Sequence, residues 1–142
     1  RYYNPPIEKQ YKIGIIPHYI DQDNEWLVQF KDNPNVNVIN ILNPLVLNFV
    51  DEVKKCDVIL SSSLHGIICG DAYGIPSYWI ELSDKVIGKG FKFLDYFLSV
   101  KRRDKKPIKI KENTKLEEIK FNDYKIDIDL DLLYNACPFR SK

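Results

Sequence analysis

Short runs of apolar and β-branched residues alternate along the first two-thirds of the chain with stretches whose apolar residues recur at helical spacing. The short runs predict β-strands, because a strand covered on both faces needs only about four to eight mostly apolar residues. Four such runs occur, at residues 11–16 (YKIGII), 36–42 (VNVINIL), 57–61 (DVILS) and 77–82 (SYWIEL).

Helical spacing predicts a helix after each of the last three strands. The helix with the clearest end is expected at residues 64–73, because Gly74 stands where a C-terminal glycine cap belongs and Pro76 prevents continuation. Asn43 is expected to cap another helix whose first turn contains Pro44. The further helices are expected at residues 24–30, 44–55 and 91–100. Strands that alternate with helices are typical of an α/β fold, here a Rossmann-like three-layer domain with a parallel sheet.

The chain changes in character after residue 100. Residues 101–106 (KRRDKK) are expected to form a solvated basic hinge, from which Arg102 and Arg103 could still reach an anionic substrate. Two further helical segments are expected, one at 114–119 opened by the capping-box residue Thr114 and one at 129–136 that closes the fold.

The length and the charge narrow the class of protein. The 142 residues fit a single domain, 1–142, with one hydrophobic core. A net charge of +1 argues against a protein that coats nucleic acid, so no nucleic-acid partner is expected. No apolar run approaches the ~18 residues of a membrane span. The three cysteines, Cys56, Cys69 and Cys137, lack CxxC spacing and indicate thiols in a reducing compartment rather than a disulfide or metal site.

Ligands of open parallel sheets bind beyond the carboxyl ends of the strands. Both histidines of the chain, His18 and His65, follow predicted strands and therefore fall on this edge. Five of the six glycines lie between Gly66 and Gly90, in the loops and the helix that follow the third and fourth strands. This clustering predicts a site at the carboxyl edge of the sheet.

The loop after the third strand predicts an anion site. Ser62 or Ser63 can cap the helix that follows, and a helix start binds anions through its free N–H groups. The helix dipole supplies only about 0.3–1 kcal/mol, whereas micromolar binding needs about 8 kcal/mol. Cations must therefore help, and Lys85 and Lys89 are expected to arrive from the neighbouring loop.

Each of these residues also has a purely structural interpretation. The glycines at positions 66, 70 and 74 leave one helix face nearly bare and suit close packing on the sheet. His18 can simply close a turn after Pro17, and Lys85 and Lys89 can be solvated lysines of a flexible loop.

The sequence resembles the polysaccharide pyruvyl transferase family over residues 11–100. The resemblance rests on four stretches: 14–19 (GIIPHY), 61–66 (SSSLHG), 71–76 (DAYGIP), and 85–90 followed by Phe93 and Asp95. It implies a fold similar to the GT-B glycosyltransferases, with two Rossmann-like lobes. This chain would be the C-terminal, donor-binding lobe, and the N-terminal lobe of the same protein would be a partner. It implies transfer of the enolpyruvyl group of phosphoenolpyruvate to a saccharide acceptor as a pyruvate ketal.

The resemblance also implies roles for individual residues. His65 corresponds to the histidine at the family's helix start and is expected to be catalytic, and Lys89 corresponds to the lysine of its glycine-flanked loop. The other expected substrate-binding residues are His18, Ser62, Ser63, Leu64, Gly66, Glu81 and Lys85. Many members carry arginine at the position of Ser63, so this chain lacks an expected clamp for phosphate or carboxylate. No cofactor or metal is expected, the site of action would be the cytoplasm or its membrane face, and one lobe by itself is expected to be inactive.

Two other functions fit the same residues. In the first, the chain is the donor lobe of a glycosyltransferase that uses a nucleotide sugar, and Glu81 holds the ribose. In the second, it is a non-catalytic lobe that serves as an interaction module in a larger assembly.

Overall fold

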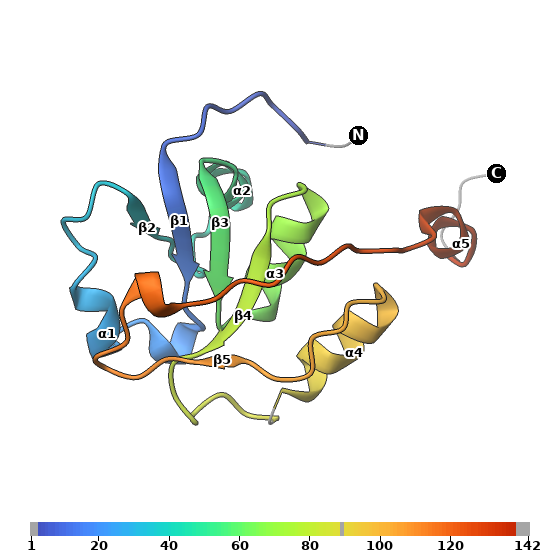
Figure 1. Ribbon diagram of the computed structural model, residues 1–142. Coiled ribbons are helices and arrows are strands. Elements are labelled where there is room, and N and C mark those ends of the chain that lie inside the picture. The colour runs from blue at the N-terminus through green and yellow to red at the C-terminus, as the bar shows by residue number, and fades with distance from the viewer. Residues whose placement is uncertain (1–2, 89, 139–142) are drawn as a thin grey trace.

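Five parallel strands form one sheet in the computed structural model, which describes residues 3–88 and 90–138 (Figure 1). The order across the sheet is β2-β1-β3-β4-β5, and every neighbouring pair is parallel. The strands are β1 (Tyr11–Ile16), β2 (Val36–Val38), β3 (Cys56–Ser61), β4 (Ser77–Glu81) and β5 (Ile108–Lys109). The predicted α/β fold with a parallel sheet is confirmed.

Helices cover both faces of the sheet and give three layers (Figure 1). One face packs against α2 (Val46–Lys54), α3 (Leu64–Ala72) and α4 (Phe91–Ser99), and the other packs against α1 (Glu25–Val28) and the 3-10 helix η2 (Leu116–Glu118). The strands alternate accordingly: Ile16 and Ile59 belong to the cluster with α2, whereas Ile15 and Leu60 belong to the cluster with α1. A second 3-10 helix, η1 (Tyr19–Asp21), follows β1, and α5 (Leu130–Asn135) lies at the end of an extended arm.

The boundaries differ from the predicted ones where polar side chains bind the local backbone. The second strand ends at Val38, because the amide oxygen of Asn40 accepts a hydrogen bond from the Leu42 N–H and turns the chain. Similarly, Asn43 forms a turn with the Leu45 N–H, so α2 begins at Val46 instead of Pro44. Such short side-chain bonds compete with regular structure.

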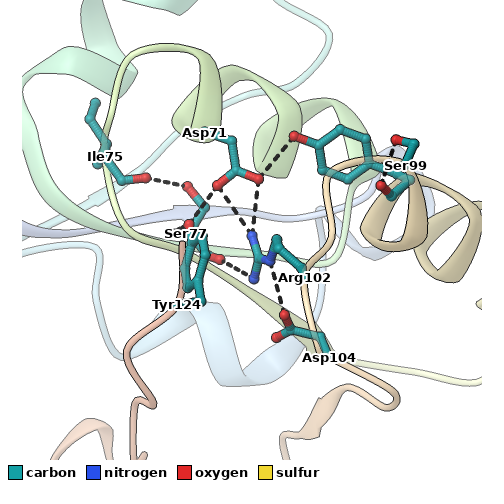
Figure 2. Close-up of polar contacts among 8 residues, drawn as sticks. Asp71, Ile75, Ser77, Ser99, Arg102, Asp104 and Tyr124 are labelled. Atoms are coloured by element: carbon teal, nitrogen blue, oxygen red, sulfur yellow. Dashed lines mark hydrogen bonds and ion pairs between the residues drawn. The ribbon is translucent and has the colours of Figure 1, made fainter. Parts of the chain in front are cut away.

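The segment after α4 is the main correction to the predicted fold. Arg102 was expected to be solvated, but its side chain is fully buried and its guanidinium forms an ion pair with Asp71 at the end of α3 (Figure 2). The chain then adds β5 beside β4, a strand that no hydrophobic pattern in the sequence predicts, with Ile80 opposite Ile108. The expected capping box also lies elsewhere, because the Thr114 hydroxyl accepts a bond from the Lys111 N–H and η2 begins at Leu116.

The Arg102 guanidinium uses most of its donors on three partners. Nη1 donates to both Asp71 oxygens at 3.0 and 3.2 Å, Nη2 donates to the Ser77 carbonyl at 2.9 Å, and Nε donates to Asp104 at 2.9 Å (Figure 2). The Tyr124 hydroxyl donates to Asp71 at 2.5 Å and accepts from the Ser77 N–H at 2.6 Å, while its ring lies 3.6 Å from the guanidinium carbon. A buried charge pair is tolerated only when its remaining hydrogen-bonding capacity is satisfied, as it is here.

Two helices end in the same motif with different residues. At the end of α3 the Ile75 N–H donates to the Gly70 carbonyl, and Gly74 takes the left-handed position with φ of 67°. At the end of α4 the Arg102 N–H donates to the Phe97 carbonyl, and Lys101 takes that position with φ of 55°. The predicted glycine cap at Gly74 is confirmed, and Lys101 adopts a conformation that strains residues other than glycine.

Exchanging the residue types at these two positions should therefore change stability in opposite directions. Gly74→Ala is expected to lower the free energy of unfolding by about 1 kcal/mol, although no atom obstructs the new methyl group. Lys101→Gly is expected to raise it by up to about 1 kcal/mol, measured by urea denaturation. Lys101→Ala is the control, because it removes the exposed ion pair with Asp127 but keeps the strain; equal stability of the alanine and glycine variants would contradict this account.

Removal of the buried cation is expected to be far more costly. Arg102→Ala leaves the Asp71 carboxylate buried without a cation and should lower the free energy of unfolding by about 3–5 kcal/mol. An Arg102→Leu, Asp71→Leu double variant should lose less than the single variant, because it buries no unpaired charge. Arg103→Ala, at the exposed neighbouring position, should change stability by no more than about 0.5 kcal/mol. A loss for Arg102→Ala as small as that for Arg103→Ala would show that the network contributes little.

Candidate active site

A groove of about 630 Å³ opens at the carboxyl edge of the sheet between α2 and α3. Apolar side chains of α2 and α3, including Val46, Phe49 and Ile68, form most of its lining. The polar groups that line it are His18, Asn43, Ser63, His65 and Lys92, together with the phenol Tyr19. The two histidines, which lie 47 positions apart in the sequence, therefore share one groove, as the sheet-edge argument predicts.

His18 is fixed in one tautomer by its own turn. Its backbone N–H donates to the Ser62 hydroxyl at 2.8 Å, and its Nδ1 accepts a bond from the Ile20 N–H at 3.4 Å. The neutral ring therefore carries its proton on Nε2. Burial lowers the pKa of His18, and the nearby positive charge of Lys92 lowers it further, against an opposing effect of Asp21. Near pH 7, His18 is thus a neutral hydrogen-bond donor.

The start of α3 is organised by Ser61 instead of the two serines that were expected to cap it. The Ser61 hydroxyl, fully buried, accepts a bond from the Ser63 N–H at 3.0 Å and lies 2.9 Å from the Ile16 carbonyl. Ser63 occupies the cap position but makes no side-chain cap bond, and Ser62 bonds His18. The N–H groups of Leu64 and His65 lie in the first helical turn, where no helical partner exists for them. His65 is exposed there and lines the groove.

The glycines of α3 serve close packing on the sheet. A Cβ on Gly66 would lie 2.4 Å from the Ser61 hydroxyl oxygen, and one on Gly70 would lie 1.8 Å from that of Ser77. The Cβ position of Gly66 points at β3, so this residue lets the helix approach the sheet; its predicted contact with substrate stays a prediction.

Lys92 is a groove residue that the sequence analysis missed. It lies in the first turn of α4, and its charge acts on His18. The signal that could have found it is its position two residues after Gly90, directly after the glycine-flanked loop from which cations were expected. Of the two lysines that were expected, Lys85 is exposed and lines neither this groove nor the neighbouring hollow, and Lys89 lies outside the described residues.

Two of the other expected site residues line a separate hollow of about 430 Å³ beyond β4, whereas Leu64 lines neither hollow nor groove and packs against the cluster that contains Trp79 and Phe93. Ser62 and Glu81 lie in it together with Trp79 and Ser83. Glu81 pairs with Lys109 at 3.5 Å, and Ser83 donates to Asp21 at 2.5 Å. Asp21 is 3% exposed, and its Oδ2 has no hydrogen-bond partner within residues 3–88 and 90–138. The structure therefore divides the predicted site into a groove with cationic groups and an acidic hollow.

The cysteine that lines the groove is not suited to act as a nucleophile. Burial raises the pKa of the Cys69 thiol to about 11, so this groove residue is protonated and a poor nucleophile near pH 7. In the part of the chain that the structure describes, no group of three or more histidine, cysteine or acidic side chains could hold a metal ion. The same described residues, 3–88 and 90–138, contain no helix that is long and apolar enough to cross a membrane. The groove thus offers a neutral donor, an exposed imidazole, an ammonium group and helix N–H groups, a combination that suits an anion.

Comparisons with known proteins agree with the resemblance seen in the sequence. A family model described as polysaccharide pyruvyl transferase matches residues 3–84, which include β1 to β4 and the start of α3. An uncharacterised protein of Acanthamoeba polyphaga mimivirus is 34% identical over 135 residues, which cover 90% of this chain and 46% of the viral protein. The chain thus spans about half the length of the curated relative it matches. No solved structure matches the chain.

The charge of Lys92 should be measurable in the titration of His18. The folded state favours the neutral form of His18, so its pKa should lie below 6.5, and Lys92→Ala should raise it by removing the repulsion. NMR titration of the ring protons against pH measures both values, and Lys85→Ala is the matched control because that exposed lysine lies outside the groove. Because the folded pKa is depressed, His18 should favour the folded state above about pH 6.5 and favour it less as the pH falls through that value. An unchanged His18 pKa in Lys92→Ala would contradict the geometry of the groove.

Proposed function

Because the chain belongs to the polysaccharide pyruvyl transferase family, we propose that its groove binds phosphoenolpyruvate as the donor of a pyruvyl group. The observation that carries this proposal is the convergence of His18, His65 and Lys92 at the start of α3. Phosphoenolpyruvate carries a phosphate and a carboxylate, so it needs several donors or cations within one small volume. The groove supplies them from three segments of the chain.

The proposal assigns each acidic group of the donor a type of partner. The first-turn N–H groups of α3 face the edge where the groove opens, and a helix start of this kind favours an anion. Lys92 adds a full positive charge near the position where many family members have arginine and this chain has Ser63. His18 donates from Nε2 without a charge of its own. An interaction with a charged group contributes about 1.5–3 kcal/mol, so three such contacts near the upper end of this range, together with the helix start, reach the free energy of micromolar binding.

His65 is the proposed proton donor. Its imidazole delivers a proton to C3 of the enol, C2 becomes oxocarbenium-like, and a hydroxyl of the saccharide bonds to C2 and returns its proton to the imidazole. A second hydroxyl of the same sugar then displaces phosphate from C2 and closes the ketal, and the proton of that hydroxyl leaves with the phosphate. Histidine can donate and recover a proton near neutral pH, and a positioned acid contributes about 10²–10⁴ in rate. His65 suits this role because it is exposed in the groove instead of buried in the core.

The complete enzyme requires a second half in this proposal. The chain spans 46% of its viral relative, and we assign it the role of a C-terminal lobe similar to that of GT-B proteins, with the acceptor saccharide bound mainly by an N-terminal lobe. The apolar rim of the groove supports such a contact, since Leu42 is 60% and Val46 is 69% exposed there. The reaction would take place in the cytoplasm or at its membrane face, and residues 1–142 alone would bind donor without turnover.

Calorimetric titration of the chain with phosphoenolpyruvate tests the donor assignment. Binding should weaken about 10- to 100-fold in Lys92→Ala, which removes one charged contact, whereas Lys85→Ala should bind like the unchanged chain. In the full-length protein, His65→Ala should lower the rate of ketal formation by about 10²–10⁴ while the melting temperature changes little.

The same titration with UDP- and GDP-sugars separates the alternatives. Binding of a nucleotide sugar without binding of phosphoenolpyruvate would contradict the proposal and favour a glycosyltransferase in which Glu81 holds the ribose. Normal ketal formation by a His65→Ala, Lys92→Ala variant would favour a lobe without a catalytic role.

A further inference from the structure

A second cationic hollow, of about 410 Å³, lies along the β5 edge of the sheet. We call it the β5-edge pocket and define it by four basic residues of its lining, Arg103, Lys105, Lys106 and Lys120. The first three belong to the segment that was expected to be a solvated hinge, and the fourth comes from the chain after η2. All four are exposed. The fold therefore gathers charges from two segments into one concave surface.

The buried network lies beside the backbone that carries these side chains. Arg102 and Asp104 bond one another, and the Arg102 side chain is fully buried (Figure 2). Arg103 and Lys105 come from the same stretch, between and after these two anchored residues, and both are exposed. On the other wall, Phe121 stacks on Tyr78 at 4.7 Å between ring centroids, which sets the position of the neighbouring Lys120. The backbone that carries these cations is thus anchored on both sides of the pocket, by the Arg102 network and by the stacked rings of Tyr78 and Phe121.

The charge of the pocket is nearly uncompensated. Its one acidic lining residue, Asp104, already accepts from the Arg102 guanidinium. None of the four defining cations has an ion-pair partner among the residues that the structure describes. Like charges that line one pocket repel one another, and an anionic ligand relieves that repulsion. Since the whole chain has a net charge of only +1, the concentration of charge is local.

We propose that the β5-edge pocket binds a phosphate or diphosphate group, at a site separate from the groove of His65. The volume is in the range of small-molecule sites, and ammonium and guanidinium groups are the usual protein partners of phosphate oxygens. The pocket shares Trp79 and Pro107 with the hollow that contains Ser62 and Glu81. A ligand whose phosphate lies among the lysines can therefore extend a hydroxyl-bearing part toward Glu81. A soluble phosphorylated saccharide and the headgroup of an anionic lipid both present this chemistry.

NMR titration of the 142-residue chain with inorganic pyrophosphate tests the site. Amide signals of residues 103–106 and 120–122 should shift to saturation, and the affinity should fall as salt is added. A Lys105→Glu, Lys106→Glu variant should bind at least tenfold more weakly at these amides. The matched control is Lys12→Glu, Lys31→Glu, which makes the same change in net charge at two exposed positions away from the pocket, and it should alter the affinity less than twofold.

Two further arms identify the source of the phosphate and separate the two sites. If the chain sediments with phosphatidylglycerol vesicles but not with phosphatidylcholine vesicles, and the Lys105→Glu, Lys106→Glu variant does not sediment with either, the ligand is a lipid headgroup. If the chain binds pyrophosphate but sediments with neither kind of vesicle, the ligand is soluble. A His65→Ala, Lys92→Ala variant should keep the shifts at 103–106, so the outcome is independent of the proposed donor site. Absence of saturable shifts in these amides, or equal binding by the 105/106 and 12/31 variants, overturns the proposal.

Discussion

The buried ion pair between Arg102 and Asp71 ties together segments that lie far apart in the sequence. It joins the end of α3 to the loop after α4, and the shared contacts with Ser77 and Tyr124 add the start of β4 and the C-terminal segment (Figure 2). Desolvation of two charges is costly, and the gain comes from the bonds that satisfy almost every donor and acceptor of the pair. Such a network orders the segment that leads from α4 into β5, a strand of only two residues.

The Arg102–Asp71 network also holds the elements on which both proposed sites lie. Helix α3 is held at its end by Asp71, which also accepts from Tyr96 at 2.9 Å, and it is held against the sheet by the bare face at Gly66 and Gly70. Its first turn, with His65, is therefore fixed relative to His18 at the end of β1. The loop that contains Arg102 leads into the β5-edge pocket on the other side of the network. One buried cation thus supports both the groove proposed for the acidic donor and the pocket proposed for a phosphate group.

Features that depend on residues close together in the sequence were predicted correctly, whereas features that depend on distant residues were not. Strands β1, β3 and β4 and helices α3 and α4 were predicted to within about one residue at each end, because each depends on a local hydrophobic pattern and on caps such as Gly74. The edge position of His18 and His65 followed from strand order alone. Arg102 was misjudged because its nearest neighbours in the sequence are charged and solvated, while its partner Asp71 is 31 positions away. Lys92 was missed because helical spacing does not show which exposed residue of a first turn faces a groove.

The sequence by itself determined the class of the fold, the order of the first four strands and their helices, and the family, because local pattern and short motifs such as 61–66 contain that information. Only the tertiary structure decided which polar residues share a site. In the folded chain Ser63 and His65 share one groove with Lys92, whereas Ser62 and Glu81 line another hollow. The side chain of Arg102, which was expected to be solvated, is buried. The physical reason is that a side chain's environment is set by contacts with residues far away in the chain. Those contacts exist only after the sheet has brought its carboxyl ends together.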